Sequence, residues 1–174
     1  MKKLGIFSIA LALAFGLAGT ASAQSRTIHD GIDHGIPRYS DIRGLSVHNR
    51  AKIVTATIRL SRVVPDKTSA YLLIQAKKGK KATPLLYSVG TEASGHGHRW
   101  VLIGFSDEDS SKSVKCPGLH VRVVPRQQRV RIRVPQHCLT GLPWMRASSF
   151  GALTEEPGNG SDEDQTRMFP LHRG

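Results

Sequence analysis

The sequence is poor in aromatic residues, which make up 6% of its 174 residues. Exposed planar rings form the usual platform on which sugars and the bases of single-stranded nucleic acids stack. Trp100 and Trp144 are instead expected to pack in a core or at sheet edges. The scarcity of rings therefore disfavours a stacking surface, and we do not expect nucleic acid to be a partner.

The sequence also lacks, beyond residue 20, any apolar run that approaches the roughly 20 residues needed to span a bilayer. Its first residues follow the pattern of a secretory signal: Met1 to Lys3 carries positive charge, Leu4 to Ala18 is apolar, and Ala21 to Ala23 is a small-residue cleavage site. We therefore predict a signal peptide over residues 1–23 and a secreted (extracellular or periplasmic) mature chain without a transmembrane segment.

Familiar catalytic patterns are missing as well: the sequence contains no G-x-S-x-G, H-E-x-x-H, phosphate-binding loop or C-x-x-C. This absence favours a non-enzymatic protein, for which we predict no catalytic residues, no metal and no cofactor. Two histidine-rich segments, His29 to His34 and Gly95 to His98, keep an alternative open, since imidazole and carboxylate groups bind zinc or copper. That alternative is a small secreted hydrolase or a metal-binding protein that uses these loops.

Acidic side chains are few: 13 aspartates and glutamates stand against 25 lysines and arginines. The imbalance is concentrated in residues 41–150, which hold 19 basic and 6 acidic side chains, whereas residues 151–174 hold 2 basic and 5 acidic ones. A polycationic body attracts anionic polymers and acidic surfaces, although the same charge also simply keeps a protein soluble. A purely structural domain is therefore a further alternative to a binding domain.

Short segments in which apolar and polar residues alternate recur from Asp41 onward, separated by glycine and proline turns. This pattern is typical of an all-β fold, an antiparallel β-sandwich of immunoglobulin-like or carbohydrate-binding-module-like type. About eight strands are predicted, at residues 45–48, 53–60, 70–76, 84–89, 99–105, 119–124, 129–134 and 145–153. The predicted organisation is an irregular N-terminal arm (24–40), the sandwich (41–153) and an acidic, flexible C-terminal tail (154–174). The alternative for the end of the tail is that Met168, Phe169 and Leu171 dock back as a final short strand.

Residues 119–134 predict a hairpin whose register can be read from the sequence. Pairing Val124 with Arg129 places apolar residues opposite one another on one face and sets Arg122 opposite Arg131 on the other. Like charges directly opposite destabilise a sheet, so this face must be well solvated or must meet an anion. The arginines of the hairpin are Arg122, Arg129, Arg131 and Arg133.

A second predicted hairpin joins residues 70–76 to residues 84–89 and carries four lysines around the turn glycine Gly79. These lysines are Lys77, Lys78, Lys80 and Lys81. Together with the arginines of the first hairpin they form the predicted anion-binding surface. The expected ligand is an anionic cell-envelope polymer or an acidic protein surface.

The two cysteines, Cys116 and Cys138, flank the arginine-rich hairpin at nearly equal distances from its turn. Because disulfides persist outside the cytoplasm, we predict that these cysteines are joined. Strict alternation places them on opposite faces of the hairpin, so Pro117, Gly118 and Pro135 are expected to break the alternation near the strand ends.

Several short motifs occur together between residues 41 and 150. They are Asp41-Ile42, the strand from Ile53 to Leu60, an apolar strand started by Tyr71, Cys116-Pro117-Gly118-Leu119 with the following x-V-R-V alternation, and Cys138-Leu139. In this combination the chain resembles uncharacterised small exported β-sandwich proteins of actinobacteria. The resemblance implies an exported sandwich and assigns no ligand or catalytic residue. The first strands also resemble carbohydrate-binding sandwich modules in fold, which does not establish function.

Overall fold

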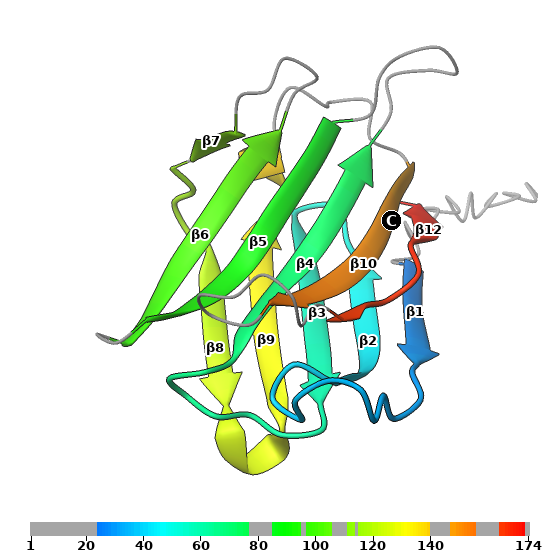
Figure 1. The fold of residues 1–174 in the computed structure, drawn as a ribbon. Coiled ribbons are helices and arrows are strands. Elements are labelled where there is room, and N and C mark those ends of the chain that lie inside the picture. The colour runs from blue at the N-terminus through cyan, green and yellow to red at the C-terminus, as the bar shows by residue number, and fades with distance from the viewer. Residues whose placement is uncertain are drawn as a thin grey trace, which may run out of the picture.

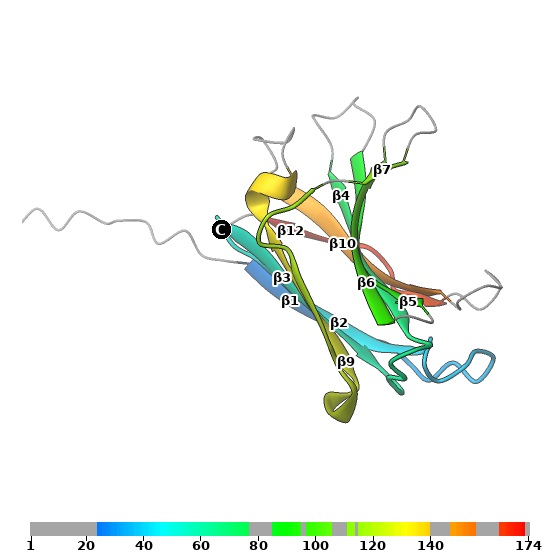
Figure 2. The same cartoon turned by 90° about the vertical axis from the view of Figure 1, so that its left-hand side faces the viewer.

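The computed structural model of the protein describes residues 24–76, 85–94, 97–105, 111–113, 115–139, 147–155 and 164–172. Within these ranges nearly all regular structure is β, with two short 3-10 helices, η1 (Pro125–Gln127) and η2 (Gln136–Leu139). The strands form two antiparallel sheets that face each other, as the edge-on view in Figure 2 shows. The expected all-β antiparallel sandwich is confirmed.

The first sheet contains five of the described strands, in the order β1-β2-β3-β9-β8 (Figure 1). These strands are β1 (Gln24–His29), β2 (Ile42–Asn49), β3 (Ile53–Leu60), β8 (His120–Val124) and β9 (Arg129–Pro135). In β3 every second residue is buried, because successive side chains of a strand point to opposite faces of the sheet. The first sheet therefore has one face toward the core and one face toward solvent.

The second sheet has the order β11-β10-β4-β5-β6-β7, and β12 also pairs with β10. Its strands are β4 (Ser69–Ala76), β5 (Leu85–Ser94), β6 (Gly97–Phe105), β7 (Ser111–Ser113), β10 (Ala147–Glu155), β11 (Asp164–Gln165) and β12 (Phe169–His172). β4 lies between β10 and β5, with Leu72 and Ile74 in the core. Tyr71 and Leu73 are also buried, although they alternate with these core residues. Burial on both faces explains the nearly continuous apolar sequence of β4.

The core between the sheets contains aliphatic side chains from both layers and Phe150 as its largest fully buried residue. β9 contributes Val130, Ile132 and Val134, so the strand that carries the arginines on one face anchors itself through the other. Burial of apolar side chains stabilises each by about 1.5–3 kcal/mol relative to exposure. The core therefore holds the solvent-facing side chains of β9 on a fixed backbone.

Each of the eight predicted strands corresponds to a strand of the structure, and residues 53–60 match β3 from end to end. The predicted hairpin register is also confirmed, because β8 pairs with β9 with Val124 opposite Arg129 and Arg122 opposite Arg131. β4 and β5 form the second predicted hairpin, with Ala76 opposite Leu85. Its lysine-rich tip lies outside the described residues.

The N-terminal arm differs from the expectation. Gln24–His29, which the composition places in an irregular segment, forms β1 and pairs with β2. Four of its first five residues are exposed and Ile28 is its single buried side chain, so an apolar alternation is absent from the sequence. The strand exists because β2 supplies its hydrogen-bonding partner.

The C-terminal tail also differs from the expectation in part. Residues 164–172 are not a free tail, because β11 and β12 both pair with β10 and Phe169 and Leu171 enter the core. This segment is ordered despite its polar neighbours, because the burial of Phe169 and Leu171 outweighs the loss of chain entropy. Residues 156–163, which hold most of the acidic run, lie outside the described residues.

None of the residues that the structure describes belongs to a helix long and apolar enough to cross a membrane. The predicted signal peptide, residues 1–23, lies outside the described ranges.

Candidate anion-binding face

The solvent-facing side of the first sheet brings five arginines together on three adjacent strands. We call this surface the basic face; its arginines are Arg59 on β3, Arg122 on β8, and Arg129, Arg131 and Arg133 on β9. All but the half-buried Arg129 are exposed. Their position follows from the alternation of β3 and β9, whose other residues point into the core.

The strand register sets several of these arginines directly opposite one another. Arg59 pairs across the sheet with Arg129, and Arg131 pairs with Arg122. Arg133 has a histidine, His120, opposite on β8. Residues directly opposite in an antiparallel pair have Cα atoms about 4.5–5.5 Å apart, so these positive groups repel each other unless an anion lies between them.

Carboxylates are absent from the described part of this face. Reading across the sheet from β1 to β8 gives three rungs of opposing residues. They are Ser25-His48-Thr55-Arg133-His120, Thr27-Ser46-Thr57-Arg131-Arg122 and His29-Gly44-Arg59-Arg129-Val124. The rungs contain cationic, imidazole and hydroxyl groups and no acidic one, so the sheet itself does not neutralise its arginines.

A hollow of about 270 Å³ lies on this face. Its polar lining residues are Thr55, Thr57, His120, Arg122, Arg131 and Arg133, and its floor is formed at Ala56 and Ile132. The hollow arises because β3 presents short threonine side chains beside the long arginine side chains of β9 and β8. Three arginines and two threonines thus border one concave site.

Arg129 is the most constrained member of the basic face. Its Nη2 donates a hydrogen bond to Oε1 of Gln127, whereas its Nε is buried and has no hydrogen-bond partner among the described residues. Local burial lowers the pKa of the Arg129 guanidinium, and the charges of Arg131 and Arg59 lower it further. This guanidinium therefore has one buried donor without an acceptor and two cationic neighbours, Arg131 and Arg59.

Three residues of this surface were not predicted from the sequence. Arg59 and the two threonines Thr55 and Thr57 belong to β3, whose polar residues the sequence shows clearly. That β3 lies beside β9, however, is a long-range pairing between segments about 75 residues apart in the chain. The predicted lysines Lys77, Lys78, Lys80 and Lys81 lie outside the described residues, so the structure brings together only the arginines of the predicted site.

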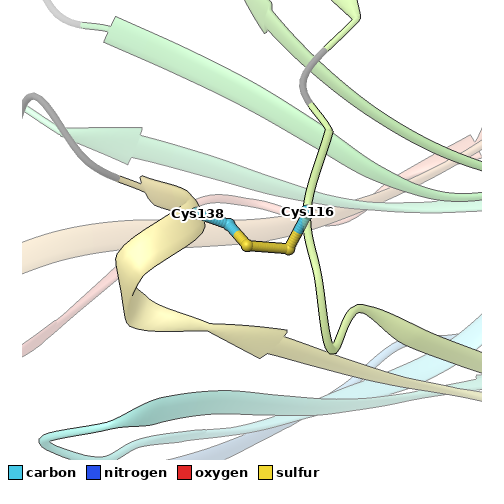
Figure 3. Close-up of a disulfide and its surroundings, with 2 residues drawn as sticks. All are labelled: Cys116 and Cys138. Carbon is cyan, nitrogen blue, oxygen red and sulfur yellow. A yellow bond between two sulfur atoms is a disulfide. The ribbon is translucent and has the colours of Figure 1, made fainter.

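The predicted disulfide between Cys116 and Cys138 is present, with the two Cα atoms 5.3 Å apart (Figure 3). Figure 3 shows that it joins η2, after β9, to the segment before β8. Gly118 adopts a positive φ of 84°, and the helical turn of η2 rotates Cys138 away from the alternation of β9. These two features allow the cysteines to meet, although strict alternation would place them on opposite faces of the hairpin. The bond closes the open end of the arginine-bearing hairpin.

The histidine-rich segments do not form a metal site in the described part of the chain. His29 and His34 are exposed, and no group of three histidine, cysteine, aspartate or glutamate side chains in the described ranges is arranged to hold a metal ion. His96 lies outside those ranges, so the hydrolase alternative built on His96 and His98 stays a hypothesis.

Four of the described aspartates, Asp30, Asp33, Asp41 and Asp164, lie near the start of β2, next to the His29 end of the third rung. The backbone N–H of Ile42 donates to Asp164 Oδ2 over 2.7 Å, and that of Asp33 donates to Asp41 Oδ1 over 3.3 Å. Burial raises the pKa of the Asp164 carboxyl; the Ile42 N–H opposes this rise, and Asp30, Asp41 and Asp33 add to it.

Comparison with models of known protein families and with curated protein sequences finds no match for this chain. The candidate site therefore rests on its own geometry and charge.

Proposed function

We propose that this protein is an exported, non-enzymatic domain that binds an anionic cell-envelope polymer through the basic face. The observation that carries the proposal is the presence of five arginines on β3, β9 and β8 with no carboxylate on the described rungs. Arginine is suited to this role because its planar guanidinium group binds anionic oxygen groups through two parallel hydrogen bonds. An elongated sheet face also matches an elongated ligand better than a small molecule.

The energetics of the face favour this proposal. Opposing like charges such as Arg59 and Arg129 destabilise a sheet, so a face of this kind without an anion is a structural disadvantage. A bound polyanion removes this repulsion by placing negative charge between the arginines. The hollow beside Thr55 and Thr57 supplies a concave surface on which a polymer residue can rest.

The proposed location outside the cytoplasm has two supports. The first 23 residues have the pattern of a signal peptide. The disulfide between Cys116 and Cys138 is a bond that persists in oxidising compartments. The resemblance to small exported proteins of actinobacteria implies the same compartment.

The proposal is tested by salt-gradient elution from heparin resin and by co-sedimentation with purified cell-wall polysaccharide, using residues 24–174. The triple variant Arg122→Gln, Arg131→Gln, Arg133→Gln is expected to elute at clearly lower salt than the wild type, because three positive charges of the basic face are removed. Salt elutes the protein because it screens exposed charge interactions within about 8–10 Å at physiological salt. The control variant Arg38→Gln, Arg62→Gln, Arg167→Gln removes the same charge from three exposed arginines elsewhere. It is expected to shift elution much less.

Two results would contradict the proposal. Equal shifts for the two triple variants would show that only net charge matters and that the basic face has no special role. Retention of the wild type no stronger than that of a neutral sandwich domain would show that the face binds no polyanion.

A further inference from the structure

The two arginines Arg122 and Arg131 share one rung and one hollow. They lie directly opposite each other on β8 and β9, and both line the hollow that Thr55 and Thr57 border from β3. Arg133, two residues further along β9, lines the same hollow. The three arginines therefore border one hollow, and none of its lining residues is negatively charged.

The number of acceptor oxygens distinguishes the anionic groups that suit such a pair. A carboxylate has two oxygens, which one guanidinium group occupies in a bidentate contact. A phosphate monoester has three strong acceptor oxygens and a charge of about −1.5 to −2 near neutral pH. A sulfate half-ester likewise presents three terminal oxygens. Two arginines on opposite strands can each use a different pair of these oxygens, so a tetrahedral ester matches this pair better than a carboxylate.

Resting on the proposed function, we infer that the hollow binds a sulfate or phosphate monoester group of the polymer between Arg122 and Arg131. Thr57 lies on the same rung as this pair and Arg133 on the next rung; both line the hollow and supply further donors. The adjacent rung of Arg59 and Arg129, two residues along β9 and thus about 7 Å away, repeats the paired arrangement with the unpaired Nε of Arg129. A second ester group on the same polymer occupies that rung.

The experiment compares three derivatives of one polymer that differ only in their anionic group. Dextran sulfate, dextran phosphate and carboxymethyl dextran of equal length and charge density are titrated against residues 24–174. The wild type is expected to bind a tetrahedral-ester dextran about tenfold more tightly than carboxymethyl dextran. If the phosphate is the preferred group, its binding weakens below about pH 6, where the monoester loses charge, whereas binding of the sulfate does not.

The decisive variant is Arg122→Lys with Arg131→Lys, which keeps both positive charges and removes both planar guanidinium groups that can make bidentate contacts. It is expected to weaken binding of the tetrahedral-ester dextran more than binding of carboxymethyl dextran, so that the tenfold preference is lost. The control Arg38→Lys with Arg62→Lys makes the same chemical change at two exposed positions outside the rungs and is expected to keep the preference. Thermal unfolding of each variant verifies that it is folded.

The outcomes separate the inference from the function on which it rests. Equal affinity of the wild type for the three dextrans, or an unchanged preference in the double-lysine variant, overturns the inference and leaves polyanion binding intact. Failure of every dextran to bind the wild type more strongly than the Arg122→Gln, Arg131→Gln, Arg133→Gln variant overturns the proposed function as well.

Discussion

The side-chain oxygen Oε1 of Gln24 accepts a hydrogen bond from the backbone N–H of His172, 2.7 Å away and 148 positions later in the sequence. Close by, the guanidinium group of Arg26 lies 5.4 Å from the centre of the Phe169 ring. The first and last described strands, β1 and β12, are therefore in contact although they belong to different sheets. Figure 1 shows them side by side at one edge of the sandwich. The C-terminal segment closes this edge of the core.

Replacement of Phe169 by alanine tests this closure. Phe169 is 2% exposed, so its truncation leaves a cavity at the edge of the core and is expected to lower the free energy of unfolding by about 3–5 kcal/mol. Pro170→Ala, at the exposed neighbouring position of the same strand, is the control and is expected to change the midpoint little. Equal thermal midpoints for the two variants would show that β12 does not contribute to the core.

The disulfide is expected to stabilise the domain by closing a long loop. For the 22-residue separation of Cys116 and Cys138, the chain-entropy model gives about 3 kcal/mol. The Cys116→Ser, Cys138→Ser variant should therefore unfold at lower denaturant concentration than the wild type. Reductant should lower the wild-type midpoint and leave that of the variant unchanged. A free thiol found by mass spectrometry in protein recovered from the medium would contradict the predicted pairing.

Gly90 is expected to tolerate no side chain. A Cβ at this position would clash with the carbonyl oxygen of Ala70 and lie 2.7 Å from Cα of Tyr71, both on the neighbouring β4. Gly90→Ala must push these backbones apart and is expected to destabilise the protein by at least about 2 kcal/mol. Gly31→Ala is the matched control, because a Cβ at Gly31 meets nothing within 4 Å. Similar unfolding curves for the two variants would argue against the close approach of β4 and β5.

The carboxyl of Asp164 is expected to make stability depend on pH. Its pKa is raised in the folded state, chiefly by burial, so it holds its proton more tightly folded than unfolded. Its favourable contribution is therefore complete below the unfolded pKa of about 3.9 and is lost as the pH rises through the higher folded value. Asp164→Asn cannot ionise and keeps an acceptor for the Ile42 N–H.

The thermal midpoint of Asp164→Asn should therefore exceed that of the wild type by an amount that grows as the pH rises from about 4 to 7. Asp66→Asn, at an exposed position, serves as the control and should show no such growth. A constant difference between Asp164→Asn and the wild type across this range would contradict the assignment.

The sequence by itself determined the features that depend on neighbouring residues. The alternation of apolar and polar residues predicted β3 from Ile53 to Leu60, because successive side chains of a strand lie on opposite faces of the sheet. The register of β8 and β9 was readable for the same reason, since one pairing satisfied both apolar faces and placed Arg122 opposite Arg131. The partner of Cys116 was readable because the chain has one other cysteine.

Only the tertiary structure decided which strands lie side by side. Arg59 meets Arg129 because β3 pairs with β9, and no local pattern specifies a pairing between strands so distant in the chain. β1 has one buried side chain and therefore no alternation of its own. β12 alternates between buried and exposed residues, but it is only four residues long. Their order comes from hydrogen bonds offered by β2 and β10, and from the burial of Ile28, Phe169 and Leu171 that those neighbours make possible.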